Sequence, residues 1–575
     1  MKSFWSASRF LILALCLSFS FFASLPTLLA AMPAPKPGMD VEAFREILIQ
    51  EGGRKKPFDT FARETVRTIT GREKFAGFDP VELIFSWLTE TKAWEQQPIL
   101  DATFQPLQKQ VNLKVENGRI APAALAANDE FQLLIQSIHT KQEAGQSLSE
   151  LEKHAASLQQ KMNLFYSLAA GTTLALVPVP GGAWQSLDKL AERYPDLAAM
   201  QAAAAPEAKI AGAVQAVLAG YFQNDAATFG QMGTLLRDGL REQGRNVGDT
   251  LSATDIQREL TLNRWKPFRI AWLLYALAFF ILVCSLWLRG KALYIAGLSV
   301  LTAAFGVHLY GFILRCMIAG RPPVTNMYES VIWVSFGVVL FALVFEAIYR
   351  ARYYAVAAAA VATLLLVLAD SVPSILDPSI DPLVPVLRSN YWLTIHVLTI
   401  TLSYAAFALA LGVGDASLGR YIFKAKDDAK TQRLNYFIYR SIQVGVVLLA
   451  AGTILGGVWA NASWGRFWGW DPKEVWALIA LLGYLAILHG RYAGWLRGFG
   501  LAVGSVVAFL LVLMAWYGVN FILGVGLHSY GFSSGGAKGM AVFVGIQLLW
   551  VALAVFRYKG GKSLELRASL GNSSP

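Results

Sequence analysis

The sequence carries little charge for its length and very little cysteine. Only 15% of its 575 residues are charged, whereas 55% are hydrophobic. A soluble chain of this size needs far more polar surface, so a bilayer must be a major solvent. The three cysteines, Cys16, Cys284 and Cys316, lie in or beside apolar segments without a disulfide or metal spacing. No Cys-x-x-Cys-His segment is present, which excludes a c-type cytochrome.

The first 31 residues have the features of an export signal. Two basic residues, Lys2 and Arg9, precede an apolar run from Phe10 to Leu29. This pattern is typical of a signal peptide or an uncleaved membrane anchor. Leu29 stands at the −3 position of the one candidate cleavage site, which tilts the choice towards an anchor. In either case we expect the following residues to be exported.

Residues 32–265 differ from the rest of the chain because they are polar and rich in Ala and Gln. Several stretches show helical spacing, and they predict a mostly helical periplasmic domain. The stretch Lys55–Glu64 fits either a docking surface or the start of a helix, and we favour the helix start. The sequence does not reveal the role of this domain.

From residue 268 onward the chain is a series of apolar segments. Each is long enough to cross a bilayer, which takes roughly 20 helical residues. The expected spans are 268–288, 292–314, 327–348, 353–371, 391–417, 438–460, 473–490, 497–519 and 540–557. The predicted fold is therefore all-α, a polytopic bundle of about nine transmembrane helices with an N-terminal signal or anchor.

The distribution of Lys and Arg predicts the topology. Five basic connections fall on one side if the start is exported, and positive loops mark the cytoplasm. They also account for the net charge of +11 without nucleic acid. We therefore expect a bacterial inner-membrane protein with a cytoplasmic tail at 559–575. The connections 320–326, 371–390, 461–471 and 520–538 then face the periplasm.

One of these periplasmic connections is unusually rich in tryptophan. Its end reads as a helix start, because Asp471 can cap, Pro472 suits the first helical position and Glu474 can complete a capping box. The glycines among the indoles leave room for a flat apolar platform, which suits a large planar ligand. An aromatic belt at the membrane interface is the competing interpretation, and the residues alone leave both open. The indoles concerned are Trp464, Trp468, Trp470 and Trp476.

Four of the six histidines lie in or beside the membrane segments, where ionisable groups are costly and often functional. His396 lies just inside the fifth span and His528 in the connection after the eighth. Both can flank the tryptophan connection and form a bis-histidine axial pair for a haem iron. His489 lies near the opposite end of its span, and His308 is more readily explained as a structural residue.

The pattern Trp464-Gly-x-x-Trp468-x-Trp470-Asp471 resembles the WWD signature of haem-handling membrane proteins. Together with Gly320–Ser330 and Gly526–Phe532, it resembles the CcsA/ResC family of System II cytochrome c biogenesis over residues 268–558. The resemblance implies haem b as the ligand, with His396 and His528 on the periplasmic iron and His489 at an inner site. It also implies that a CcsB/ResB-type partner supplies the histidine opposite His489.

The function expected from this resemblance is cytochrome c assembly. Haem would be presented for thioether attachment to the Cys-x-x-Cys-His of an apocytochrome c, whose thiols other proteins keep reduced. The chain would then be part of a cytochrome c synthase. Two side chains, Arg466 and Lys473, are candidates to pair with the haem propionates by charge alone. The alternatives are a haem exporter or chaperone without ligation activity and a b-type membrane redox protein; a solute transporter using Glu346 or Asp415 is disfavoured.

Overall fold

The computed structural model describes residues 32–196, 205–288, 290–383, 389–424, 428–524 and 536–571, with 561–571 as backbone only. The export signal expected over residues 1–31 and the motif Gly526–Phe532 with His528 lie outside the described residues. The chain divides into an N-terminal unit, Met1–Glu51 with Lys55–Thr250, and a membrane unit, Gly52–Arg54 with Leu251–Pro575. Each unit is described by itself.

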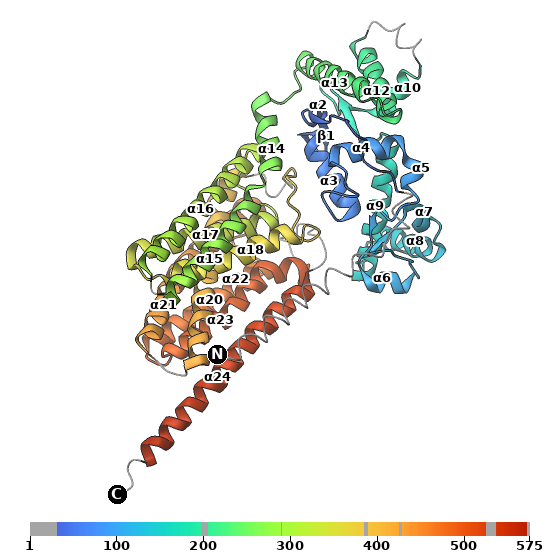
Figure 1. Cartoon of the computed structure of the whole chain (residues 1–575). Helices are drawn as coiled ribbons and strands as arrows, with labels where there is room; N and C mark the ends of the chain where they lie inside the picture. Colours follow the sequence, from blue (N-terminus) through green and yellow to red (C-terminus); the bar gives the residue numbers. More distant parts are fainter. Residues whose placement is uncertain are drawn as a thin grey trace, which may run out of the picture. The chain divides into compact units, whose positions relative to one another are not determined.

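The N-terminal unit is mostly helical, as the spacing of its apolar residues predicts (Figure 1). Three short strand pairs, which the sequence did not predict, supplement the helices: β1 (Leu48–Glu51) with β2 (Arg54–Pro57), β3 (Leu100–Asp101) with β4 (Arg119–Ile120), and β5 (Ala175–Val177) with β6 (Gln185–Ser186). The helices are α2 (Glu42–Arg45), α3 (Phe58–Thr70), α4 (Pro80–Thr89), α5 (Thr91–Trp94), α6 (Gln105–Gln110), α7 (Pro122–Ala126), α8 (Asp129–Glu143), α9 (Glu150–Ala169), α10 (Leu187–Arg193), α12 (Pro206–Phe222) and α13 (Ala226–Asn246).

An aromatic cluster forms the centre of this unit. The Phe44 ring lies 4.7 Å from both Phe85 and Phe229, measured between ring centroids. A Cβ atom at Gly233 would overlap the Phe44 ring, so the helix α13 can approach α2 only because residue 233 is glycine. Packing of this kind, rather than the small strand pairs, holds the unit together.

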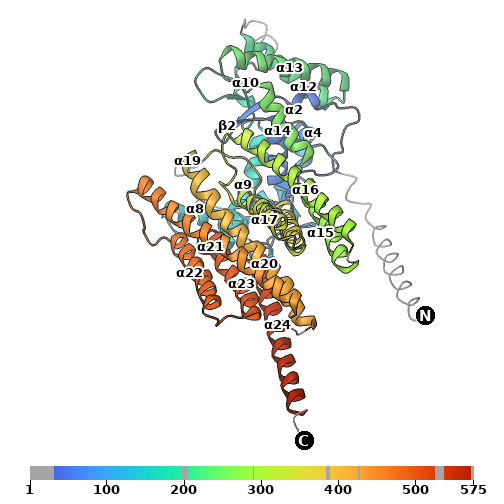
Figure 2. The same ribbon diagram turned by 90° about the vertical axis from the view of Figure 1, so that its left-hand side faces the viewer.

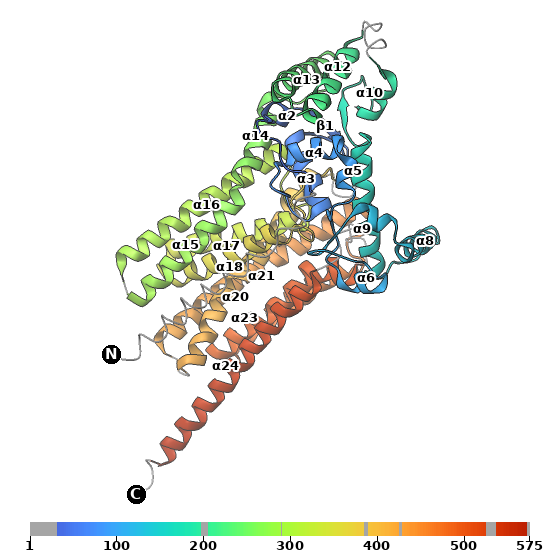
Figure 3. The same ribbon diagram turned by 45° about the vertical axis from the view of Figure 1, so that its right-hand side comes forward.

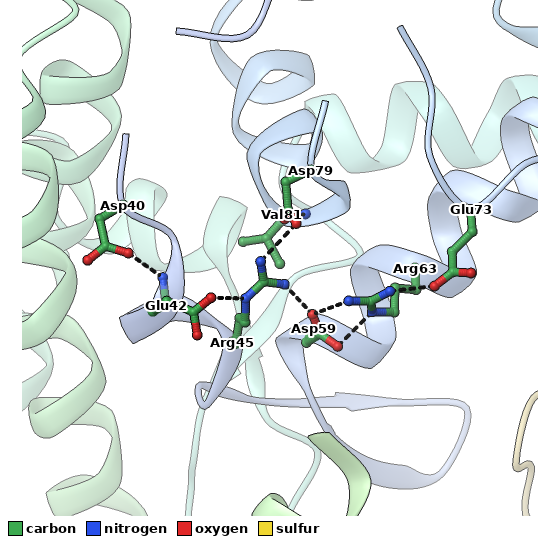
Figure 4. A network of polar contacts seen from close by, with 8 residues as sticks. All are labelled: Asp40, Glu42, Arg45, Asp59, Arg63, Glu73, Asp79 and Val81. Atoms are coloured by element: carbon green, nitrogen blue, oxygen red, sulfur yellow. Dashed lines mark hydrogen bonds and ion pairs between the residues drawn. The ribbon is translucent and has the colours of Figure 1, made fainter. Parts of the chain in front are cut away.

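The stretch Lys55–Glu64 is the start of a helix and not a docking surface. Lys56 and Asp59 are buried, and α3 begins at Phe58 without a side-chain cap. Figure 4 shows Asp59 between the guanidinium groups of Arg45 and Arg63. Burial alone raises the pKa of Asp59, but the hydrogen bonds and charges of the two arginines outweigh it, so the pKa lies below its ordinary value.

The membrane unit contains nine helices in the described residues that are long and apolar enough to cross a bilayer, which confirms the expected number of spans. They run side by side in Figure 2 and Figure 3. The elements are α14 (Ala253–Trp265), α15 (Pro267–Leu288), α16 (Lys291–Ala319), α17 (Met327–Tyr349), α18 (Tyr353–Ser371), α19 (Asn390–Trp392), the π-helix η4 (Leu393–Val397), α20 (Leu398–Lys424), α21 (Ala429–Trp464), α22 (Pro472–Tyr492), α23 (Gly498–Leu513), the π-helix η5 (Met514–Leu523) and α24 (Ala537–Gly571).

Several boundaries differ from the sequence-based ranges. Helix α14, which the sequence assigned to the polar domain, belongs to the membrane unit. Helix α21 continues to Trp464, four residues beyond the expected end of its span. Helix α24 continues to Gly571, into the segment expected to be a tail. In α21 and α24 the apolar stretch ends before the helix does, because backbone hydrogen bonds can continue a helix through polar residues.

The two acidic residues considered for transport have structural partners. Glu346 accepts hydrogen bonds from the hydroxyl of Tyr294 at 2.9 Å and from the backbone N–H of Arg352 at 2.8 Å. Asp415 accepts a hydrogen bond from Gln547 at 3.2 Å. These contacts connect neighbouring helices, as expected for polar groups inside a bundle.

Candidate functional site

The tryptophan connection lies between two well-defined helix ends. Helix α21 ends at Trp464, where Gly465 adopts the left-handed conformation with a φ of 68°. Helix α22 begins at Pro472 with the predicted capping box, in which Asp471 accepts from Lys473 N–H and Glu474 reaches back to the Asp471 N–H. Both ends follow from local sequence, since glycine tolerates positive φ and Asp caps helices. Only residues 465–471 remain for the connection.

Glu474 holds this connection in shape. Its carboxylate accepts hydrogen bonds from the backbone N–H of Gly469 at 2.8 Å and of Asp471 at 3.2 Å, and it pairs with Arg466 at 3.3 Å. Trp470 lies between the two bonded N–H groups and has a φ of 58°. This conformation is strained for a bulky residue and persists only where the surroundings impose it. Glu474 therefore fixes Trp470 with its indole 71% exposed.

The tryptophans do not form one flat platform in this structure. The rings of Trp468 and Trp470 lie edge to face, with centroids 6.0 Å apart and planes at 90°. Trp476 lies in the first turn of α22 and is half-buried. The expectation of a flat platform is therefore wrong in its geometry, since edge-to-face packing, one of the two arrangements that aromatic pairs prefer, occurs here.

The two candidate cations both have protein partners. Arg466 pairs with Glu474 and stacks over the Trp464 ring at 5.6 Å. Its guanidinium also covers Gly469 so closely that a Cβ there would overlap it. Lys473 donates to the amide oxygen of Asn520 at 3.1 Å. An anionic group bound here would share these cations with the protein rather than meet unused charges.

His396 packs against the last turns of α21. Its ring meets Trp459 edge to face at 5.6 Å, and its Nδ1 lies 2.8 Å from the carbonyl oxygen of Gly452. A Cβ at Gly456 would come within 2.7 Å of the imidazole. The absence of a side chain at Gly456 thus lets the ring lie directly on the helix, and the same absence at Gly452 lets Ile400 approach it.

The hydrogen bond to Gly452 sets the tautomer of His396. A carbonyl oxygen can only accept, so Nδ1 carries the proton, and the lone pair of the neutral ring is on Nε2. Metal-ligating histidines commonly donate their other ring nitrogen to a backbone carbonyl in this manner. His396 also lies in η4, and π-helical turns often occur at functional sites.

The tryptophan connection and His396 share one end of α21. Phe467 packs its ring against Gly457, next to the glycine that supports the His396 ring. The connection and the imidazole are thus held by consecutive residues of one helix. His528 and its motif lie outside the described residues, so the structure does not place that histidine.

The remaining histidines have separate environments. His308 is fully buried on α16, where its Nδ1 lies 3.2 Å from the hydroxyl of Tyr275 and aromatic rings surround it. His489 is exposed on α22 and its Nδ1 donates to the carbonyl of Leu485 at 2.7 Å. In the N-terminal unit, His154 is half-buried and stacks on Phe104, with the ring centroids 3.8 Å apart.

Two buried polar contacts of the membrane unit were not predicted from the sequence. Arg315 and Glu329 form a fully buried ion pair at 2.9 Å between α16 and the start of α17. Trp516 of η5 donates to the hydroxyl of Ser330 at 2.9 Å. The available signal for the ion pair was an arginine directly after the expected span 292–314, since a charge at the membrane needs a partner. The Trp516 contact had no signal in the sequence.

Comparison with known proteins points to one family. The family model described as "Cytochrome C assembly protein" matches residues 324–528. The cytochrome c biogenesis protein CcsA of Prochlorococcus marinus strain MIT 9301 is 38% identical over 252 residues, which are 39% of this chain and 80% of that protein. CcsA of strain MIT 9215 is 34% identical over 294 residues, which are 45% of this chain and 94% of that protein.

A longer relative also matches the N-terminal unit. Protein NrfI of Wolinella succinogenes is 28% identical over 511 residues, 85% of this chain and 54% of that protein. The match is longer than residues 251–575 and so extends into the N-terminal unit, while the chain spans about half the length of NrfI. Among solved structures, the cytochrome c haem lyase CcmF aligns with a TM-score of 0.37 and 14% identity, over 51% of this chain and 50% of that chain.

Proposed function

This chain belongs to the cytochrome c assembly family, and on that premise we propose that it holds haem b at the periplasmic face of the inner membrane for thioether attachment to apocytochrome c. The observation that carries the proposal is the geometry of His396. Its Nδ1–H is anchored on Gly452, which directs the metal-binding lone pair to Nε2. Haem is the substrate of this reaction and not a resident cofactor.

The residues around His396 fit a porphyrin. Trp459 lies against the imidazole, and the connection with Trp468 and Trp470 is fastened to the same end of α21. Indole faces and edges provide apolar contacts for a planar ring. Arg466 and Lys473, although already engaged, supply positive charge for the propionates. The second axial ligand proposed is His528, which follows η5.

The chemistry assigned to the haem itself is the addition of two cysteine thiols across its vinyl groups. Each S–H adds to a C=C bond, so no oxidant is consumed, but the thiols must arrive reduced. This chain's part is to fix the ring, so that the reaction has the character of an intramolecular step. The histidine of the apocytochrome's Cys-x-x-Cys-His then replaces one holding imidazole, which releases the product.

The inner site requires a second subunit in this proposal. His489 is exposed on α22, with its Nδ1 directed to Leu485, and so its Nε2 carries the lone pair. We assign the opposing ligand to a CcsB/ResB-type partner. A haem exporter without ligation activity is the second candidate, since the same histidines would serve it. A b-type redox protein is disfavoured, because His308 is enclosed by aromatic rings and Tyr275.

Covalent attachment tests the proposal directly. The chain, purified with its partner and loaded with haem, is mixed with a reduced peptide containing Cys-x-x-Cys-His, and the products are separated by denaturing electrophoresis. We expect haem to remain attached to the peptide, and a peptide with both cysteines replaced by serine serves as control. If haem binds but never becomes covalently attached, the exporter is correct; if no haem binds at all, the whole proposal fails.

A further inference from the structure

We propose that the first turns of α17 position two π-helical turns, η4, which contains His396, and η5, with Glu329 and Ser330 as the positioning residues. This inference rests on the proposed function. Three side chains of this short stretch make polar contacts with other helices, namely Glu329 with α16, Ser330 with η5 and Trp333 with the first residue of α20. No contact of this kind was expected from the motif Gly320–Ser330 itself.

The first branch starts at the carboxylate of Glu329. It accepts hydrogen bonds from the N–H and the hydroxyl of Thr325 at 2.8 and 2.7 Å, and it pairs with Arg315. Arg315 in turn donates to the carbonyl oxygens of Pro378 at 2.8 Å and Ser379 at 3.1 Å. Glu329 thus holds Arg315 in the orientation that fixes the connection leading to α19 and η4.

The second branch reaches the ligand helix itself. Trp333, one turn further along α17, donates its indole N–H to the carbonyl of Leu398 at 3.4 Å. Leu398 directly follows η4, and a π-helical turn leaves carbonyl groups that need donors from outside the helix. The second branch therefore holds the η4 turn at the residue that follows it, whereas the first branch holds Pro378 and Ser379 of the connection before α19.

The third branch runs from Ser330 to the segment before His528. The hydroxyl of Ser330 accepts from the indole of Trp516 at 2.9 Å and donates to the Met327 carbonyl at 2.8 Å. The Trp516 carbonyl accepts from Asn520 at 3.1 Å, and Asn520 accepts from Lys473 in the first turn of α22. One serine thereby connects α17 with η5 and, through Asn520, with the helix that follows the tryptophan connection.

Burial makes these contacts consequential. Glu329 is 0% and Arg315 3% exposed, and Ser330 is also buried. A buried ion pair is weak evidence for overall stability, but it can specify one arrangement of the chain over others. Here the arrangement specified is that of two π-helical segments, η4, which contains His396, and η5, which precedes His528 in the sequence. A merely structural role would instead lower stability without a specific effect on the iron.

The test compares Ser330→Ala with Ser335→Ala. Both serines are buried on α17, but the hydroxyl of Ser335 donates to the carbonyl of Ala362, at 3.4 Å, and not to η4 or η5 as far as the structure describes them. Haem affinity, the low-spin spectrum and the thermal midpoint are measured on the purified protein with its partner. We expect Ser330→Ala to weaken haem binding by about 10-fold or more, as outer contacts of metal ligands commonly do, with restoration of the low-spin spectrum by added imidazole. Ser335→Ala should bind as the wild type does.

Two further variants separate positioning from folding. Trp516→Phe removes the other half of the same hydrogen bond, so its effect should not add to that of Ser330→Ala. Glu329→Gln keeps the shape of the side chain and should lower affinity in the same direction. Wild-type affinity and spectrum in both Ser330→Ala and Glu329→Gln would overturn the inference. A wild-type protein without a bis-imidazole spectrum would instead refute the proposed function.

Discussion

The close contact between Gly456 and His396 allows a quantitative prediction. A Cβ at residue 456 would lie 2.7 Å from the imidazole Cε1, whereas carbon atoms normally approach to about 3.5–4.0 Å. In Gly456→Ala the ring must therefore move by about 1 Å. The backbone itself does not resist the change, because Ala is more favourable than Gly in a helix by up to about 1 kcal/mol.

A shift of this size breaks the contact that orients the imidazole. The Nδ1 of His396 lies 2.8 Å from the Gly452 oxygen, and an added displacement of about 1 Å exceeds hydrogen-bonding distance. Loss of the oriented donor should reduce haem affinity about 10- to 100-fold, as for other outer contacts of metal ligands. This corresponds to about 1.4–2.8 kcal/mol of binding free energy.

Haem titration of the purified protein, followed in the visible spectrum, measures this loss. Gly306→Ala is the matched control, since it also adds a methyl group to a membrane helix but meets no atom within 4 Å. Added imidazole should restore the low-spin spectrum of Gly456→Ala by replacing the displaced ring. Unchanged haem affinity in Gly456→Ala, with the protein folded, would refute the assignment of His396 as an anchored ligand.

Three further predictions concern other parts of the molecule. Glu474→Gln weakens the hydrogen bonds from the backbone N–H groups of Gly469 and Asp471, each of which contributes about 1.5–3 kcal/mol while the acceptor is charged. Iodide should therefore quench the fluorescence of the connection's indoles more strongly than in the wild type, and equal quenching would contradict this role of Glu474. Asp59→Asn should destabilise the N-terminal unit by about 3–5 kcal/mol in thermal unfolding at neutral pH. Folding lowers the pKa of Asp59, so the stabilisation from its carboxylate is complete above the unfolded pKa of about 3.9 and is lost as pH falls through the folded pKa. The unfolding temperatures of wild type and variant should therefore converge in acid. A difference in unfolding temperature that does not change with pH would contradict this. His489→Ala should stop cytochrome c maturation in cells while leaving binding of externally added haem intact, and normal maturation would remove His489 from the pathway.

The spans and the start of α22 could be predicted because their signals are local. Nine apolar stretches of sufficient length define the bundle, and Asp471, Pro472 and Glu474 specify a helix start within four residues. Such features depend on composition and short-range hydrogen bonding alone. The mostly helical N-terminal unit was predictable for the same reason, whereas the burial of Lys56 and Asp59 was not, because charged residues are normally exposed and their ion pairs appear only in the folded structure.

The details of the candidate site depend on tertiary contacts. Nothing in the sequence indicates that Gly452 offers its carbonyl to His396, or that η4 is π-helical. The perpendicular packing of Trp468 and Trp470 likewise follows from the clamp at Glu474, which acts through backbone N–H groups. Patterns of residue type predict which side chains gather, but hydrogen-bond partners decide how those side chains are oriented.

The most direct test of the central claim is the low-temperature electron paramagnetic resonance spectrum of the oxidised, haem-loaded protein. The account predicts a low-spin signal with two imidazole ligands, which is lost in His396→Ala and restored by added imidazole. A low-spin bis-imidazole signal that is identical in wild type and His396→Ala would show that another residue holds the iron. It would contradict the role of the Gly452-anchored histidine.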